Sequence, residues 1–449
     1  MCSFFNNLTA FFFIFDIFVI IILFNNGRES SPFQFEFVVC INSIDSMYAN
    51  HNYLINHSDV ILAKPVLYLR KYWISMIEST RRSQKFFYLS GIRRLGKKSI
   101  MSHIARCDTN HKVIIIHADT LDRGWKDNAS NIVEFLQYSV RQYGAIDVFI
   151  GEVELLNNYE ILLDYIAQEW GIGHCFLTTS HELFLKWYFQ THQVLYHGQK
   201  MLPMEYDEYR THGKQFRSFI HYVKDTGIPE ALSLEKAWHQ PIFDYYFQSL
   251  VSMILLQDIV WFYSVGNVIL LKATFDYILR NAGKPLTYHF IASQLQVQWH
   301  RAHHATIKSY CGYFEDVGLF HKIQEYDVHG WFWHHIMFIP IDHGIINFYQ
   351  DSHNDVRPIA LATIIVNRLI TLGHDIAATT TSTWYVDIID YQHKVCYMIA
   401  IWRTQQQINQ SRASYLRAWY TIWVVDLVAW HYDWYDTIDG LQLFKILTK

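Results

Sequence analysis

Between residues 86 and 180, short apolar runs alternate with segments whose apolar residues recur at helical spacing. The apolar runs predict β-strands at 86–89, 112–117, 145–150 and 175–178. The helical spacing predicts helices near 97–106, 131–143 and 157–169. Strands that alternate with helices indicate a parallel sheet, and continuous apolar strands are expected where helices cover both faces of it. This part of the chain is therefore predicted to be an α/β domain.

The alternation of strands and helices ends near residue 205, and from there to residue 263 the apolar residues recur at helical spacing. Three more helical segments and two strand-like runs follow, at 269–281, 286–295, 304–317, 319–323 and 331–339. Three helices followed by a β-hairpin is the layout of a winged helix. An α/β pattern then returns, with a helix at 358–372 and strands near 384–389, 395–402 and 420–428.

The N-terminal region begins with the apolar run Leu8–Phe24, which Asp16 interrupts. Its length is at the lower limit for crossing a bilayer, and a central aspartate costs about 2.5–3.5 kcal/mol there. A membrane anchor through residues 8–24 is one alternative. The other is a buried extension, or a start at Met47 that leaves the run out. The polar residues 25–65 are predicted to be a linker.

Composition excludes some classes of protein. The 449 residues include 37 Lys and Arg and 41 Asp and Glu, so a strongly basic chain for bulk nucleic-acid binding is excluded. Charged residues are only 17%, against about 25% in ordinary soluble domains. The six cysteines form no CxxC pair, so neither a disulfide framework nor a cysteine zinc site is expected. A reducing compartment, the cytoplasm, is favoured.

The most informative segment is Ser90–Ser99, with the sequence SGIRRLGKKS. Gly91-x4-Gly96-Lys97 lies between a predicted strand and a predicted helix, which is the spacing of a phosphate-binding loop. Glycines let backbone N–H groups close around phosphate oxygens, and the helix N-terminus favours an anion. Lys97 would reach the β- and γ-phosphates. We therefore predict a nucleotide site here.

Two positions depart from the usual metal-binding pattern of such loops. A Ser or Thr directly after the lysine normally holds Mg²⁺, but Lys98 stands there. Ser99 comes one residue later, turned by about 100° on a helix. The strand end VFIGEVE at 148–154 has Gly151 where the Asp that organises Mg²⁺ is usual, followed by Glu152. We expect Glu152 to polarise water, or else to be a surface carboxylate at a strand end.

These motifs occur in order with LTTS at 177–180, LPMEYDEY at 202–209 and PIDHGII at 340–346. The string resembles a widespread family of prokaryotic AAA-type P-loop ATPases over roughly residues 66–449. Such proteins join a P-loop ATPase domain to a winged helix and a degenerate restriction-endonuclease-like domain. The resemblance implies an N-terminal extension at 1–65, the ATPase domain at 66–210, a helical lid and winged helix at 211–340, and the endonuclease-like α/β domain at 341–449.

The loop spacing and the resemblance together assign residues. Candidate nucleotide-binding residues are Gly91, Arg93, Arg94, Gly96, Lys97, Lys98, Ser99 and Ser180; candidate catalytic residues are Lys97 and Glu152; the candidate metal ligand is Ser99. ATP is the implied cofactor, with Mg²⁺ in doubt. Nuclease folds of this type hold Mg²⁺ with an Asp and a Glu-x-Lys, and only Asp387 matches, so no nuclease activity is expected. Histidine clusters at 300–304 and 334–335 lack an HExxH pattern, so a metal site there is not expected.

We therefore predict a nucleotide-dependent conformational switch whose ATP hydrolysis is weakened or lost. A pseudo-ATPase scaffold and a DNA-associated module remain alternatives. The expected partner is a nucleotide; DNA, a client protein and a second copy of the chain are left open. The predicted helix 304–317 carries Lys308 as its clear cation, which favours a structural rather than a DNA-binding role.

Overall fold

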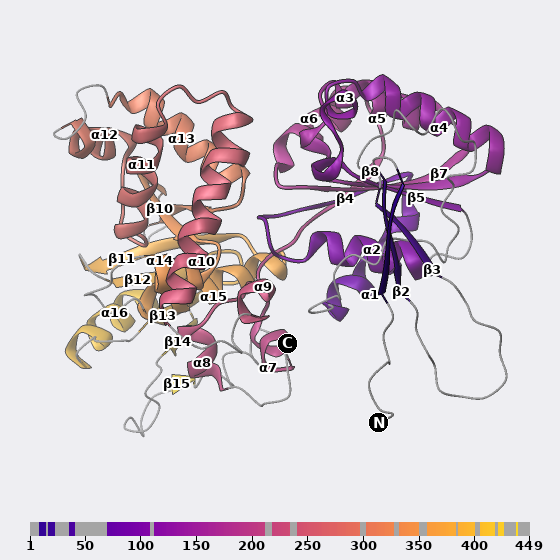
Figure 1. Ribbon diagram of the computed structural model, residues 1–449. Coiled ribbons are helices and arrows are strands. Elements are labelled where there is room, and N and C mark those ends of the chain that lie inside the picture. Colours follow the sequence, from indigo (N-terminus) through magenta and orange to yellow (C-terminus); the bar gives the residue numbers. More distant parts are fainter. Residues whose placement is uncertain are drawn as a thin grey trace, which may run out of the picture. The chain divides into compact units, whose positions relative to one another are not determined.

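The chain divides into two compact units in the computed structural model (Figure 1). The first contains Met1–Ser90 and Gly96–Lys200, and the second contains Gly91–Leu95 and Met201–Lys449. The structure describes residues 9–14, 17–22, 36–40, 70–107, 112–211, 218–233, 240–296, 302–326, 332–349, 357–382, 385–399, 405–417, 421–425 and 437–438.

The first unit contains a five-stranded parallel sheet in the order β5-β6-β7-β4-β8. Its strands are β4 (Phe86–Ser90), β5 (Lys112–His117), β6 (Ile146–Gly151), β7 (Ile172–Thr179) and β8 (Tyr196–Lys200). The predicted parallel α/β sheet is confirmed. β8 was not predicted.

Helices cover both faces of this sheet. They are α1 (Lys71–Thr80), α2 (Lys97–Cys107), α3 (Arg123–Lys126), α4 (Ala129–Tyr143), α5 (Tyr159–Gln168) and α6 (Glu182–Thr191). Figure 1 shows α1 and α2 on one face and α4, α5 and α6 on the other. The crossover from β4 runs to the far edge at β5, whereas the later crossovers run the opposite way. Because such crossovers are right-handed, the helices after the neighbours β4 and β7 lie on opposite faces, and a ligand crevice is expected at their carboxyl ends.

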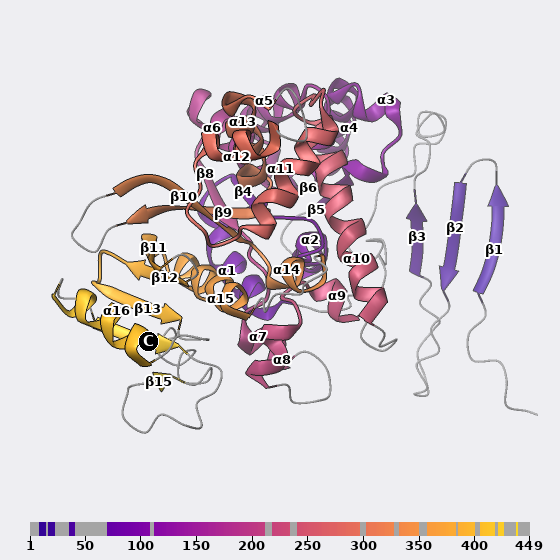
Figure 2. The ribbon, with the colours of Figure 1, turned by 90° about the vertical axis from the view of Figure 1, so that its left-hand side faces the viewer.

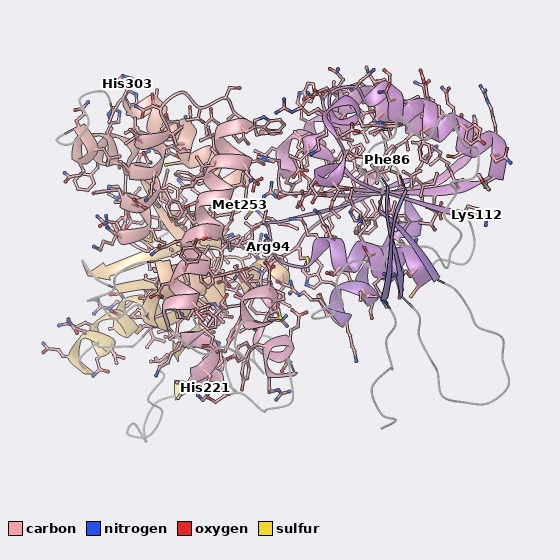
Figure 3. All side chains as sticks on the ribbon, in the orientation of Figure 1. Phe86, Arg94, Lys112, His221, Met253 and His303 are labelled. Atoms are coloured by element: carbon pink, nitrogen blue, oxygen red, sulfur yellow. The ribbon has the colours of Figure 1, made fainter. Side chains whose placement is uncertain are left out.

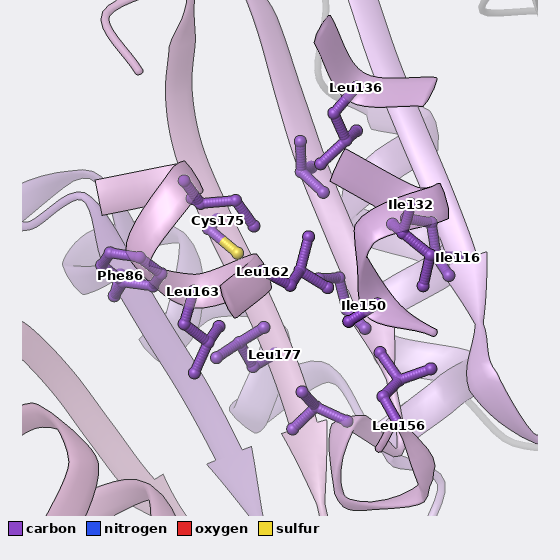
Figure 4. Packing of buried hydrophobic residues seen from close by; sticks show 14 of the residues in the cluster. Phe86, Ile116, Ile132, Leu136, Ile150, Leu156, Leu162, Leu163, Cys175 and Leu177 are labelled. Carbon is purple, nitrogen blue, oxygen red and sulfur yellow. The ribbon is translucent and has the colours of Figure 1, made fainter. Parts of the chain in front are cut away.

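The two faces of the sheet are packed differently. On the α4–α5 face, aliphatic side chains of the helices meet those of the strands, with Leu162 and Leu163 near Leu177 and Ile150 (Figure 4). Another set of rings crosses four strands in register: Phe149 stacks on Phe176, Phe176 on Phe87 and Phe87 on His197, with centroids 5.1–5.6 Å apart. The three phenylalanine rings of this set are therefore part of the core.

The second unit starts with short helices and then longer ones. They are α7 (Tyr206–Thr211), α8 (Phe219–Lys224), α9 (Pro229–Ser233), α10 (Gln240–Met253), which continues as the π-helix η5 (Ile254–Trp261), α11 (Val268–Arg280), α12 (Tyr288–Gln296) and α13 (His304–Asp316). The antiparallel strands β9 (Phe320–Tyr326) and β10 (Phe332–Pro340) follow. The helices α11, α12 and α13 followed by the hairpin β9–β10 have the predicted order. The winged-helix identity of this part stays a prediction.

The C-terminal part contains α14 (His343–Tyr349), α15 (Arg357–Thr371), β11 (Ile376–Ser382), β12 (Tyr385–Asp390), β13 (Val395–Ile399), α16 (Gln405–Arg417), β14 (Thr421–Val425) and β15 (Thr437–Ile438). β9 and β10 join these strands in one mixed sheet of seven, so the predicted boundary at residue 340 lies inside a sheet. Core residues of α15 and α16 pack on opposite faces of β12–β14. Figure 2 shows the ribbons of these helices and strands. The endonuclease-like identity of this part stays a prediction.

The N-terminal apolar run forms strands in its described residues. β1 (Thr9–Ile14) and β2 (Ile17–Ile22) are antiparallel, and β2 pairs with β3 (Glu36–Cys40), which lies inside the segment predicted as a linker. The Phe, Ile and Val residues of the run favour strands. No helix in the described ranges is long and apolar enough to cross a membrane. Met47 and the rest of the predicted linker lie outside the described residues.

Gly198→Ala tests the packing of β8 against β4. A Cβ on Gly198 would lie 2.2 Å from Cζ of the buried Tyr88, which is far inside contact distance. We expect the variant to lose about 1–3 kcal/mol of stability, seen as a lower melting temperature. Gly124→Ala in α3, where the nearest atom is 3.4 Å away, is the control and should melt like the unmodified protein. An unchanged melting temperature for Gly198→Ala would contradict this packing.

Candidate functional site

The predicted phosphate loop follows β4, and its backbone requires glycine. Gly91 and Gly96 have φ values of 144° and 95°, which side chains disfavour. A Cβ on Gly91 would also lie 2.6 Å from the carbonyl oxygen of Met201. Arg94, with φ of 72°, is a non-glycine residue in the left-handed region, a type of strain that clusters at functional sites.

The two loop arginines contact carboxylates of the second unit, to which Gly91–Leu95 belongs. The Arg93 guanidinium donates to Asp258 from Nε at 2.8 and 2.9 Å and from Nη2 at 2.6 Å. Asp258 is 2% exposed and lies in the π-helix η5. Arg94, labelled in Figure 3, donates to Glu230 Oε1 at 2.9 Å. Both predicted phosphate contacts therefore already hold a carboxylate.

The remaining loop residues belong to the first unit. Gly96 precedes α2 and accepts a hydrogen bond from Ile100 N–H at 3.0 Å. Lys97 begins the helix and is buried, and Ser99 is half-buried in the same first turn. The N-terminal N–H groups of α2 therefore lie where a phosphate loop needs them.

Lys98 has the most informative contacts of the site. Its Nζ lies 2.5 Å from Asp119 Oδ2 and 3.2 Å from Glu152 Oε1. Asp119 follows β5 and Glu152 follows β6, so the ammonium bridges the carboxyl ends of two strands. Burial opposes ionisation of Asp119, but the hydrogen bond and the charge of Lys98 outweigh it and hold the pKa of Asp119 below its usual value.

The space beside Gly151 is narrow. A Cβ there would lie 3.2 Å from Nδ1 of His117 and 3.3 Å from Cε of Met101. Burial and then the charge of Lys98 lower the pKa of His117, so the ring is neutral at pH 7. The position where such loops usually have an aspartate is thus crowded by a neutral ring and a methyl group.

Glu152 and Ser180, two of the predicted residues, lie just after β6 and β7. Each donates its backbone N–H to a side chain from the other segment. Glu152 has a left-handed backbone with φ of 57°, and its N–H donates to Thr178 Oγ1 at 3.2 Å. The Ser180 N–H donates to Glu154 Oε1 at 2.8 Å. These residues lie at the carboxyl ends of strands, beside the crevice expected between β4 and β7.

Sequence reasoning missed Glu154. Within the described residues its Oε2 and the Oγ of Ser180 are buried without a hydrogen-bond partner. Burial raises the pKa of Glu154, and the nearby charge of Glu152 adds to this, against the opposing effects of His181 and the Ser180 N–H. The available signal was a second carboxylate two residues after Glu152.

The C-terminal candidate, Asp387, accepts hydrogen bonds that hold the sheet and α16 together. Its Oδ2 accepts from Tyr415 Oη of α16 at 2.7 Å and its Oδ1 accepts from Ile399 N–H at 3.2 Å. Arg368, on the predicted helix, contacts Glu205 at 2.7 Å. These contacts add no carboxylate to Asp387.

Comparison with known proteins identifies part of the chain. Residues 83–210 match a family described as AAA domain, and residues 216–331 match a family described as Domain of unknown function (DUF8612). No curated protein matches the chain. The predicted resemblance to AAA-type P-loop ATPases is therefore confirmed for residues 83–210.

Solved structures are similar at low identity. The Walker-type ATPase PABY2304 of Pyrococcus abyssi is 13% identical, with 65% of this chain and 99% of that chain covered and a TM-score of 0.41. Drosophila ORC bound to AT-rich DNA and Cdc6 is 12% identical, with 68% and 96% covered and a TM-score of 0.22. The FIGL-1 AAA domain in complex with ADP is 14% identical, with 60% and 92% covered and a TM-score of 0.25.

Glu154→Gln tests the buried carboxyl group. A folded-state pKa above the ordinary value means that protonation favours the folded state, so this stability is present at low pH and is lost as pH rises through the folded pKa. Glutamine keeps an oxygen for the Ser180 N–H without the charge. We expect the variant to melt above the unmodified protein at pH 8, by about 2–4 °C, and this gap to shrink toward pH 5. Glu78→Gln, on the exposed face of α1, is the control. A gap independent of pH would contradict the assignment.

Proposed function

We propose that the chain binds ATP at the loop Gly91–Lys97 and uses it as a conformational switch, with hydrolysis weakened or lost. The observation that carries this proposal is the contact of Lys98 with both Asp119 and Glu152. Binding is supported by the strand–loop–helix geometry, by the two positive-φ glycines and by the AAA domain match over residues 83–210.

The residues present do not fit the usual Mg²⁺ site. In P-loop proteins a Ser or Thr after the lysine and an Asp at the second strand end hold the ion. Here these positions are Lys98 and Gly151, and a side chain at 151 would be in tight contact with His117 and Met101. Mg²⁺ requires oxygen ligands in near-octahedral geometry, whereas an ammonium group repels it. Ser99 would need a change in the first turn of α2 to replace the missing hydroxyl.

The same contact weakens Glu152 as a base. A carboxylate that orients attacking water must offer an acceptor oxygen to that water, and Lys98, 3.2 Å from Glu152 Oε1, competes with the water for one of the two oxygens. Lys97 would still stabilise charge on the phosphates, so binding can persist where hydrolysis does not. A scaffold that binds no nucleotide at all is the alternative.

The switch itself would act through the loop arginines. Phosphate groups compete with carboxylates for guanidinium, because both accept its paired N–H donors. A bound nucleotide would therefore offer Arg93 and Arg94 new partners in place of Asp258 and Glu230. Such an exchange gives the ligand a differential affinity for two states, which a conformational switch requires.

Lys97→Ala tests the nucleotide site itself. We expect ATP affinity, measured by calorimetry, to fall at least about tenfold because the cation at the β- and γ-phosphates is lost. Lys186→Ala is the matched control, since Lys186 lies in α6 and pairs with Glu182. If Lys97→Ala binds ATP as the unmodified protein does, the phosphate-loop assignment is wrong.

Lys98→Thr tests the replacement of the metal. We expect the unmodified protein to bind ATP with equal affinity in Mg²⁺ and in EDTA and to release no phosphate. Lys98→Thr restores the hydroxyl, so its ATP affinity should become higher in Mg²⁺ than in EDTA. Lys98→Arg keeps the charge and should stay independent of metal. A loss of ATP affinity in EDTA for the unmodified protein, together with phosphate release, would refute weakened hydrolysis.

A further inference from the structure

Three side chains with metal-binding groups meet at one end of the C-terminal sheet. Asp390 Oδ2 lies 2.6 Å from His374 Nδ1 and 2.7 Å from His393 Nδ1. One ligand atom from each residue lies within 4.8 Å of the others. The two imidazole rings have centroids 4.6 Å apart and are tilted by 35°. Both Nδ1 atoms therefore face one carboxylate oxygen.

The backbone of the sheet fixes this arrangement. Asp390 ends β12 and is paired with Ile376 of β11 and with Val395 of β13. His374 lies in the connection just before β11, and His393 lies in the turn between β12 and β13. Asp390 Oδ1 also accepts from His393 N–H at 3.0 Å, which holds that turn. The ligands are thus positioned by strand register.

We propose that His374, Asp390 and His393 form a binding site for a divalent transition metal, with Zn²⁺ as the best fit. Two imidazole nitrogens and one carboxylate oxygen are a ligand set that Zn²⁺ accepts, and a fourth position remains for water. The Asp390 side chain is 1% exposed, whereas those of His374 and His393 are 27% and 57% exposed. One ligand is therefore buried, and solvent can reach the other two.

The distances from Asp390 Oδ2 to the two Nδ1 atoms are those of hydrogen bonds, and a metal ion can bind after a small outward movement of the rings. Ligand atoms at about 2.0–2.1 Å from Zn²⁺ in tetrahedral geometry are roughly 3.3 Å apart. Each Nδ1 must therefore move outward by about 0.6 Å, which the exposed His393 side chain can do. Each ring would then present Nδ1 to the metal and keep its proton on Nε2.

The site is independent of Asp387. Asp387 accepts a hydrogen bond from Tyr415 of α16. It stands three residues before Asp390 in β12, and successive residues of a strand alternate between the two faces, so Asp387 lies on the opposite face from Asp390. A metal at Asp390 would join the α15–β11 connection to the β12–β13 turn, which Gln392 already links through its contact with Asp375. A bound metal would therefore cross-link these two segments and stabilise this end of the sheet.

Zinc binding by the full chain, without nucleotide, tests this site. After EDTA treatment and removal of the chelator, calorimetry with Zn²⁺ should give a tight binding event, and Zn²⁺ should raise the melting temperature. His393→Ala should weaken that event at least about tenfold and remove the temperature rise. His393 is exposed, so this change removes little packing.

His335→Ala is the matched control. His335 contacts Glu325 at 2.6 Å, which is a histidine–carboxylate pair without the third member of the proposed site. It should bind Zn²⁺ as the unmodified protein does. Cobalt(II) should give the intense visible absorption of tetrahedral coordination in the unmodified protein and lose it in His393→Ala. Equal Zn²⁺ binding by the unmodified protein and by His393→Ala would overturn the site, and tight binding of Fe²⁺ without Zn²⁺ would overturn the choice of metal.

Discussion

Charge balance at the carboxyl ends of β5 and β6 is the constraint on which the nucleotide site depends. Asp119, Glu152 and Glu154 gather there, and the ammonium of Lys98 contacts the first two. Buried carboxylates are costly unless they are paired or protonated. The contrast follows from this rule: the pKa of Asp119, beside Lys98, is lowered, whereas the pKa of the more deeply buried Glu154 is raised. Lys98 thus favours the ionised form of Asp119, whereas burial disfavours the ionised form of Glu154.

Three cationic side chains of the loop that carries this lysine each form an ion pair with acidic residues. Arg93 holds the buried Asp258 and Arg94 holds Glu230, while Lys98 holds the strand-end carboxylates. Removing one member of a buried ion pair costs about 3–5 kcal/mol because the other charge is left uncompensated. A nucleotide that takes Arg93 from Asp258 must offset such a cost. Binding and rearrangement of the second unit are therefore coupled in the proposed switch.

The fold could be predicted where residues carry a clear pattern. β4, β5 and β6 are apolar runs, and their bounds agree with the prediction to within one residue. β8 could not be predicted, because YHGQK has no apolar period and forms a strand through pairing with β4 alone. Motif spacing found Lys98 and Glu152, but not that they touch. The partners of Arg93 and the burial of Glu154 arise from tertiary packing, which spacing does not encode. His374 and His393 could not be predicted as metal ligands for the same reason, because strand register brings them together.

The two departures from the P-loop pattern are electrostatically related. A site with Ser or Thr at 98 and Asp at 151 balances its carboxylates with a magnesium ion of charge +2. This chain adds one positive charge at Lys98 and, relative to that pattern, removes one negative charge at Gly151. Together the two changes supply the same net charge as the ion. Restoring aspartate at 151 alone would add a carboxylate beside Glu152 and Glu154 and crowd His117. The two departures therefore compensate one another in charge, and restoring the aspartate alone is not expected to restore metal dependence.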